Sequence, residues 1–235
     1  MHTSPAAVVD EHAHDNPALL HHFSDEQQQK NAASLGMWIF LATEVMFFGG
    51  MFCAYLVYRH WYFGDFSAAS QTIAILPGAI NTAILICSSL TVVLAVRAAQ
   101  LNRRSQLVFW LLSTIVLGLV FLGIKGYEYH DKFVEHHVPG LNFSFIEALP
   151  GHVGAMANPH HAEIFFSLYF ALTGMHALHM IIGVGLFSFL AFEAWRGRYT
   201  SNYYTPVENS GLYWHFVDII WIYLFPLIYL IDRHK

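Results

Sequence analysis

The segment LATEVMFFGG, residues 41–50, contains a single glutamate, Glu44, inside an apolar run that extends from Leu35 to Tyr58. A charged side chain at the centre of a membrane helix costs roughly 2.5–3.5 kcal/mol on insertion scales, so such a residue usually faces protein or water. An ionisable residue in this setting is a functional candidate by default. We therefore expect Glu44 to have a polar partner elsewhere in the chain.

Polar and small residues recur at helical spacing in three further apolar runs. The stripes are Asn81, Ser88 and Thr91; His176, His179 and Gly183; and Gly211, His215 and Asp218. Helices in lipid associate through such stripes, because small residues permit close approach and polar residues form hydrogen bonds. The three histidines are the expected partners of Glu44. The sequence leaves open whether a neutral glutamic acid donates to a histidine or a glutamate pairs with a histidinium.

Each of these candidates also has a structural interpretation. His176 and His179 could ligate a metal or a haem, but zinc needs three or four ligands and bis-histidine haem needs histidines on two facing helices. We favour packing histidines. His215 and Asp218 form either a proton relay or a clamp between helices, and both interpretations stay open. The chain lacks the spaced histidines of a haem-copper centre and the paired cysteines of a dinuclear copper site, which predicts no redox centre on this chain.

The elements that position these residues follow from composition. The chain is 56% hydrophobic and 11% charged, against about 25% charged in ordinary soluble domains. Five apolar runs reach the roughly 20 residues that a membrane helix requires. They are Leu35–Tyr58, Ile75–Val96, Leu107–Tyr127, Ile164–Trp195 and Gly211–Ile231. The sequence therefore predicts an all-α membrane protein with five transmembrane helices in a bundle.

Basic residues set the expected orientation. One side of the membrane receives Lys30, Arg97, Arg103, Arg104, Arg196 and Arg198, and the other receives Arg59, Lys125, Lys132, Arg233 and Lys235. The bias is clear in the short connections, and it predicts a cytoplasmic amino terminus and a periplasmic carboxy terminus. Residues 1–32 are interpreted as a polar, histidine-rich cytoplasmic tail, either a proton-collecting segment or a plain solvated one. Residues 33–235 form the five-helix domain, with a long external loop at about 128–163.

Several segments together resemble a known family. They are LGMWIFLATEVMFFGGMF, PGAINTAILICSSLT, GIKGYEYHDKF, FALTGMHALHMIIG and YTSNYYTPVENSGLYWHFVDIIWIYLFPLIYLI, in this order. The chain resembles subunit III of haem-copper respiratory oxidases of the cytochrome c oxidase type, in a short five-helix bacterial form. The resemblance covers roughly residues 35–231, and the longer form of the family has two further helices at its amino-terminal end.

The resemblance implies an accessory subunit of the bacterial plasma (inner) membrane. Such subunits bind no haem or copper, pack beside the catalytic subunit I in a complex with subunit II and further subunits, hold structural phospholipids, and support proton uptake during O2 reduction. Glu44 matches the family's carbodiimide-reactive glutamate and is the proton-related candidate. A buried polar network is expected at positions that match family motifs: Asn81, Glu128, His176, His179, Glu208, His215 and Asp218.

Other functions stay open at this stage. Within the family, the chain could belong to a quinol oxidase or a nitric oxide reductase system, since other subunits choose between cytochrome c and quinol as electron donor. A secondary transporter would normally have an internal repeat, which the sequence lacks. A haem b anchor would carry its own absorption spectrum. No nucleic-acid partner is expected.

Overall fold

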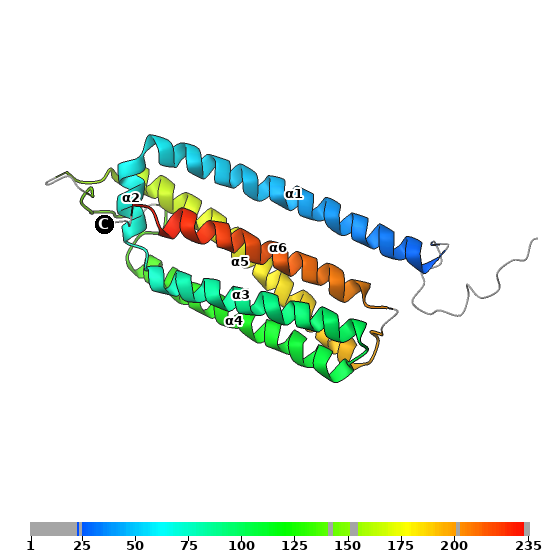
Figure 1. Ribbon diagram of the computed structural model, residues 1–235. Coiled ribbons are helices and arrows are strands. Elements are labelled where there is room, and N and C mark those ends of the chain that lie inside the picture. Colours follow the sequence, from blue (N-terminus) through cyan, green and yellow to red (C-terminus); the bar gives the residue numbers. More distant parts are fainter. Residues whose placement is uncertain (1–22, 24, 141–142, 151–154, 201–202, 233–235) are drawn as a thin grey trace, which may run out of the picture.

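The computed structural model describes residue 23 and residues 25–140, 143–150, 155–200 and 203–232, which form six helices (Figure 1). The helices are α1 (Glu26–Trp61), α2 (Phe63–Gln71), α3 (Ile75–Gln100), α4 (Arg104–Val134), α5 (Pro159–Trp195) and α6 (Thr205–Tyr229). Two isolated bridges, Ala148 with Met156 and Thr200 with Tyr203, are the β-structure in these residues. The chain is therefore all-helical in the part that the structure describes.

Five of the helices, all except α2, are long and apolar enough to cross a membrane. This confirms the predicted all-helical class and the predicted number of helices that are long and apolar enough to span a membrane. Each helix continues into polar sequence at one end or both, although α6 ends at Tyr229, two residues before the end of its predicted run. Asp25 caps α1 by accepting a hydrogen bond from the Gln28 amide at 2.6 Å, so residues 26–32, which we expected in the tail, are helical. Residues 1–22 and 24 of that tail lie outside the described residues.

The expected external loop is shorter than 128–163. Helix α4 continues to Val134, and α5 begins at Pro159, whose position in the first turn suits a residue that has no amide to donate. Asn158 caps α5 by accepting from the His160 amide at 3.0 Å. Lys125 and Lys132, which the orientation argument counted as external charges, are instead buried on α4.

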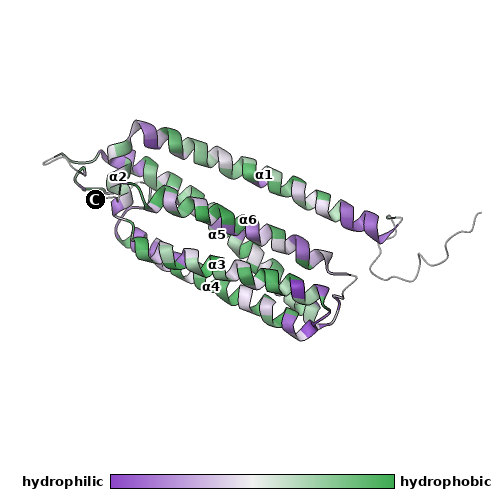
Figure 2. Cartoon of the chain, viewed as in Figure 1, coloured by the Kyte–Doolittle hydropathy of each residue, from purple (hydrophilic) through white to green (hydrophobic). Residues whose placement is uncertain are grey.

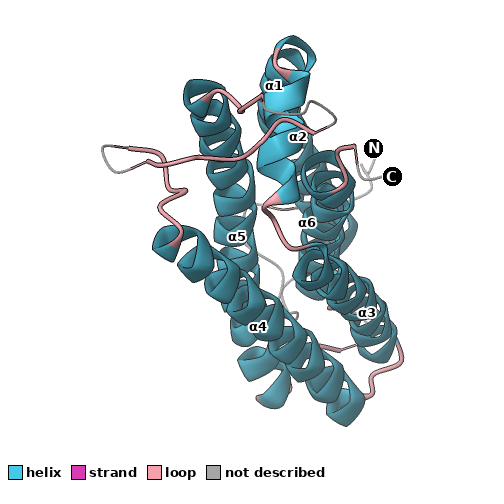
Figure 3. Cartoon of the chain, turned by 90° about the vertical axis from the view of Figure 1, so that its left-hand side faces the viewer, coloured by secondary structure: helices cyan, strands magenta, loops and turns pink. Residues whose placement is uncertain are grey.

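Helix α2 was not predicted. Its nine residues bury Phe66 and Ala69 against the bundle, and Ser70 Oγ donates to the Ile228 carbonyl at 2.7 Å near the end of α6. A helix of this length has too few turns to display a clear period in sequence. It covers the loop-bearing end of the bundle, beside α5 and α6 (Figure 3).

Helices α3, α4, α5 and α6 pack in a ring of neighbours, while α1 lies outside this group and contacts only α2, α5 and α6 among the described helices. Residues Leu41, Phe48 and Tyr55 are the buried members of α1. Their spacing of seven is two helical turns, so they form one narrow stripe. Figure 2 shows hydrophobic residues along the middle of every long helix and hydrophilic ones toward the ends, as expected for a bundle in a bilayer.

Two indoles fill the centre of the bundle. Trp214 of α6 fits between Gly118 of α4 and Gly183 of α5, where an added Cβ would lie 2.9 Å and 2.8 Å from its ring atoms. Its Nε1 donates to Ser88 Oγ at 3.0 Å, and Trp221 Nε1 donates to Thr82 Oγ1 at 3.1 Å. Glycines thus allow α4, α5 and α6 to approach closely, and hydrogen bonds from the two indoles join α6 to α3, as is typical of helix packing in membranes.

Candidate functional site

Glu44, near the middle of α1, contacts His179 of α5. His179 Nε2 lies 3.1 Å from Glu44 Oε2, and both side chains are largely buried. His179 Nδ1 lies 2.8 Å from the Met175 carbonyl oxygen. Since a carbonyl can only accept, Nδ1 carries a proton and donates it to that bond. Of the three histidines expected to meet Glu44, the structure brings only His179 to it.

This geometry restricts the protonation states of the pair. With Nδ1 protonated, a neutral His179 has an accepting Nε2, and Glu44 must then be the protonated donor. If the proton moves across, His179 becomes the doubly protonated cation and Glu44 the carboxylate. Both states contain one proton between Glu44 and Nε2. The pair can therefore hold and relocate one proton without any change in its total charge.

His176 lies one turn before His179 and has a different environment. Its ring makes an edge contact with Phe121, at 5.4 Å between ring centroids, and a tilted contact with Trp221 at 5.1 Å. Neither ring nitrogen has a hydrogen-bond partner among the described residues. His176 is therefore a packing residue of the aromatic core, separate from the Glu44–His179 pair.

Glu128 belongs to a buried ionic group that we call the Lys125 cluster: Lys125, Glu128, Tyr169 and Tyr229. Tyr169 and Tyr229 donate to Glu128 Oε1 at 2.6 and 2.5 Å. Lys125 Nζ lies 3.3 Å from Glu128 Oε2 and donates to the hydroxyls of Tyr229 and Tyr169 at 2.8 and 3.2 Å. Lys125 is 2% exposed and Glu128 5% exposed, so the pairing offsets a large desolvation cost.

Aromatic rings enclose the ammonium of this cluster. Lys125 Nζ lies 5.0–5.5 Å from the ring centroids of Tyr129, Tyr169, Trp221 and Tyr229, within the range of cation–π attraction. The cluster ties α4 to α5 and α6. Sequence reasoning selected Glu128 alone and missed Lys125 and the two tyrosines. The available signal was the i, i+3 spacing of Lys125 and Glu128, which puts both on one helix face.

His215 and Asp218 lie away from Glu44, at the contact between α6 and α3. His215 Nδ1 is 2.7 Å from Ser89 Oγ, which agrees with the clamp interpretation of His215. Asp218 is buried, and neither of its carboxyl oxygens has a hydrogen bond within the described residues. Ser89 is a site residue that the sequence argument did not name, although it neighbours Ser88 of the predicted stripe.

Asn81 and Glu208 complete the predicted network, with different outcomes. Asn81 of α3 is buried, and its amide atoms have no hydrogen bond among the described residues. Glu208 is exposed in the first turn of α6 and is not buried within the described chain. An acidic residue there interacts favourably with the positive end of the helix dipole, which explains its position. In the described part of the chain, no group of three His, Cys, Asp or Glu residues is arranged to hold a metal ion.

The loop-bearing end of the bundle has polar contacts of its own. Lys132 Nζ donates to the Thr72 carbonyl at 2.8 Å and to Glu135, whose carboxylate also lies 3.1 Å from His137 Nδ1. His137 is stacked on Phe166. Burial, followed by the positive charge of Lys132, lowers the pKa of His137 below its usual value. These contacts fix the loop after α4 against α2 and α5.

Comparison with known proteins gives consistent matches over the whole bundle. A family model described as cytochrome c oxidase subunit III matches residues 20–146 and 155–232. The chain is 31% identical over 196 residues to cytochrome c oxidase subunit 3 of Alkalihalophilus pseudofirmus, covering 83% of this chain and 85% of that protein. It is 29% identical over 225 residues to cytochrome bo(3) ubiquinol oxidase subunit 3 of Pseudomonas aeruginosa, covering 95% and 97%. It is 30% identical over 228 residues to cytochrome c oxidase subunit 3 of Thermostichus vulcanus, covering 97% and 94%.

Proposed function

The chain belongs to the cytochrome c oxidase subunit III family, and from this premise we propose that it is the accessory, non-redox subunit III of a proton-pumping terminal oxidase in a bacterial plasma membrane. It is a subunit of a haem-copper terminal oxidase, an oxidoreductase complex, and it works together with other oxidase subunits. In our proposal the chain packs directly beside subunit I, binds structural phospholipids, and leaves haem, copper and O2 chemistry to subunits I and II.

The electron donor of the complex has two candidates. We propose cytochrome c, in line with the family description and with relatives named as cytochrome c oxidase subunits. Quinol is the second candidate, because the Pseudomonas aeruginosa relative, a ubiquinol oxidase subunit, matches 95% of this chain. The donor binds to other subunits in either case.

The proposed orientation places the amino terminus in the cytoplasm. The α3–α4 turn and the α5–α6 connection lie at the same end of the bundle as the start of α1 (Figure 1). Arg97, Arg103 and Arg104 belong to the first of these connections, and Arg196 and Arg198 to the second. The excess of arginine in short connections at this end supports a cytoplasmic location.

The Glu44–His179 pair carries the mechanistic part of the proposal. Because His179 Nδ1 is bonded to the Met175 carbonyl, the proton between Nε2 and Glu44 Oε2 is the one that can move. We propose that this pair buffers protons for the catalytic subunit during sustained turnover.

The Glu44→Gln variant of the complete oxidase tests this role. Glutamine keeps the size and can donate an N–H to His179, so we expect assembly to be intact. The carboxyl group is lost, so carbodiimide labelling should disappear and activity should decline faster over many turnovers. Thr43→Val is the control, since Thr43 is an exposed neighbour outside the pair. Unchanged labelling and unchanged sustained turnover would remove Glu44 from the mechanism.

Purification through a tag on this chain tests the proposed complex itself. Gentle solubilisation should recover a large haem-bearing subunit together with the tagged chain. A redox difference spectrum should assign all haem to that partner. Stoichiometric haem or copper on the isolated chain, or recovery of the chain alone from native membranes, would refute the proposal.

A further inference from the structure

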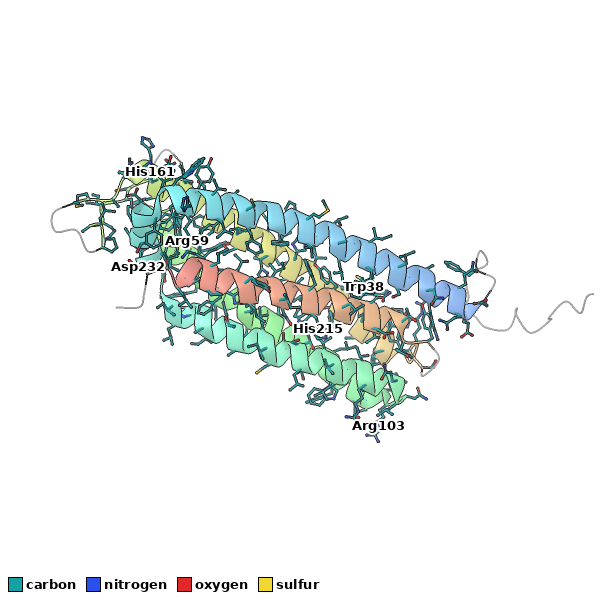
Figure 4. All side chains as sticks on the ribbon, turned by 45° about the horizontal axis from the view of Figure 1, so that its top comes forward. Trp38, Arg59, Arg103, His161, His215 and Asp232 are labelled. Atoms are coloured by element: carbon teal, nitrogen blue, oxygen red, sulfur yellow. The ribbon has the colours of Figure 1, made fainter. Side chains whose placement is uncertain are left out.

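A cavity of about 570 Å³ lies at the turn between α3 and α4, at the end of the bundle where Figure 4 labels Arg103. Its polar lining consists of Arg97 from the last turn of α3, Arg103 at the start of α4, and Ser105 and Gln106 from the first turn of α4. Among the described residues, no Asp or Glu lines it. The cavity is therefore positively charged and offers several hydrogen-bond donors.

The two arginines of this cavity have no counter-charge. Arg97 and Arg103 form no ion pair within the part of the chain that the structure describes, and Arg103 Nη1 lies 3.5 Å from the neutral Gln106 Oε1. Arg103 also gives α4 no side-chain cap, so the positive end of that helix dipole adds to the same field. Guanidinium groups bind phosphate through paired N–H donors. A phosphate group matches this set of donors.

The apolar runs on either side of the cavity indicate its depth in a membrane. The run in α3 ends at Val96, directly before Arg97, and the run in α4 begins at Leu107, directly after Gln106. Such limits lie where the hydrocarbon core gives way to the headgroup region. Trp110 also lines the cavity, and tryptophan is enriched at this level of a membrane. The arginines are thus at the depth where phospholipids carry their phosphate groups.

The rest of the lining is apolar and lies deeper along α3 and α4. Phe109 and Trp110 meet edge to face, with their ring centroids 5.0 Å apart, and Leu94 is beside them in the wall. Phe109 is 60% exposed, so this wall is open to an occupant. A free phosphate ion would leave the wall in contact with water, whereas the acyl chains of a phospholipid would cover it. The cavity therefore fits a phospholipid better than a soluble anion.

We propose that the α3–α4 turn binds the phosphate group of an anionic phospholipid, such as phosphatidylglycerol, between Arg97 and Arg103, with its acyl chains against Phe109 and Trp110. A zwitterionic lipid also carries an ammonium group, and no carboxylate lines the cavity to receive it. Basic residues beside a membrane attract anionic headgroups. The inference rests on the proposed function, to whose general phospholipid binding it assigns one site and one class of lipid.

Photoactivatable lipids test the proposal on the complete oxidase in nanodiscs. The discs contain phosphatidylcholine with a small fraction of either diazirine-labelled phosphatidylglycerol or diazirine-labelled phosphatidylcholine, and mass spectrometry measures the lipid attached to residues 94–110. We expect phosphatidylglycerol to label this segment at least about fivefold more than phosphatidylcholine, which corresponds to the attraction of one basic residue to an anionic membrane surface. Equal labelling by the two lipids would overturn the proposal.

Variants without the two charges identify the groups responsible. In Arg97→Gln/Arg103→Gln, the preference for phosphatidylglycerol should fall below about twofold, because both cations are gone. Both arginines are exposed, so the complex should still assemble. Arg196→Gln is the matched control, since Arg196 is exposed at the same end of the bundle but does not line the cavity, and it should keep the preference. A preference that survives in the double variant would overturn the proposal.

Inorganic phosphate distinguishes a lipid headgroup from a soluble anion. Its addition should lower phosphatidylglycerol labelling no more than sodium chloride of equal ionic strength, which acts by screening alone. Displacement by phosphate but not by chloride would assign the cavity to a soluble anion and overturn the lipid assignment. If oxidase subunits co-purify but residues 94–110 show no lipid preference, only this inference fails. If no oxidase subunit co-purifies, the proposed function fails, whichever lipid labels the segment.

Discussion

The Lys125 cluster makes a quantitative prediction about stability. Lys125→Met removes the cation and leaves the Glu128 carboxylate with its two tyrosine donors. Glu128→Gln leaves the ammonium without its counter-charge but keeps an acceptor for both hydroxyls. Breaking a buried ion pair costs about 3–5 kcal/mol. Helices that separate within the membrane find other polar partners, which lowers the cost, so we expect a loss of about 3 kcal/mol for each single variant.

The double variant Lys125→Met/Glu128→Gln distinguishes pairing from simple packing. It removes both charges, so no uncompensated charge stays buried, and we expect it to be no less stable than either single variant. The coupling free energy between the two positions should therefore be about 3 kcal/mol. If the two positions contributed independently, the losses would add to about 6 kcal/mol.

Reversible unfolding in mixed detergent and SDS micelles, followed by circular dichroism, measures these free energies. Val116→Met is the control, because Val116 is exposed on the same helix and carries no polar contact. It should change the free energy of unfolding by less than about 0.5 kcal/mol. Additivity of the two single variants within about 0.5 kcal/mol would refute the assignment of Lys125 and Glu128 as a coupled pair.

Two further predictions concern the core and the loop. Gly183→Ala should destabilise the chain by about 1–3 kcal/mol, because its Cβ would lie 2.8 Å from the rigid Trp214 ring, whereas Gly185→Ala on the same helix meets no atom within 4 Å and should be neutral or stabilising. Thermal unfolding of both variants measures these changes, and equal losses of stability would contradict the close fit of the Trp214 ring against Gly183. Burial lowers the pKa of folded His137, so the unfolded chain binds the extra proton more tightly, and the stabilisation present above about pH 6.5 is lost as the pH falls. His137→Phe, which keeps an aromatic ring against Phe166, should flatten the melting temperature between about pH 5 and 7; an unaltered slope would show that other groups cause it.

The long apolar helices could be predicted because the length and composition of a segment are sufficient to identify a helix that crosses a lipid bilayer. A run of about 20 apolar residues has no alternative to a helix in the hydrocarbon region. The ends of the helices were less predictable, since capping by Asp25 and Asn158 extends α1 and α5 into polar sequence. Helix α2 depends on packing against α6, and that tertiary contact has no local signal.

The sequence predicted which type of residue pairs with Glu44, but not which histidine it is. A carboxyl group within a span requires a partner, which correctly indicated a histidine for Glu44. The choice of His179 over His176 depends on the rotation of α5, since the two differ by three residues and face different neighbours. The sequence pattern gives a stripe and does not resolve such a rotation.

The ionic cluster was missed for a different reason. Lys125 near the end of an apolar run was counted as a charge outside the membrane, following the rule that cations favour aqueous loops. The tyrosines that satisfy it come from α5 and α6, 44 and 104 residues later in the chain. Only the folded bundle brings them together.

The position of α1 also has a consequence for synthesis in the membrane. Translation produces α1 first, but its partner helices α5 and α6 begin at Pro159 and Thr205. At about 5–20 residues per second, the roughly 100 residues between the end of α1 and the start of α5 take about 5–20 s to make. During that interval Glu44 is in the bilayer, or at the insertion machinery, without His179. An unpaired charged carboxylate is costly in lipid, so α1 obtains its polar partner on this chain only after α5 has been made.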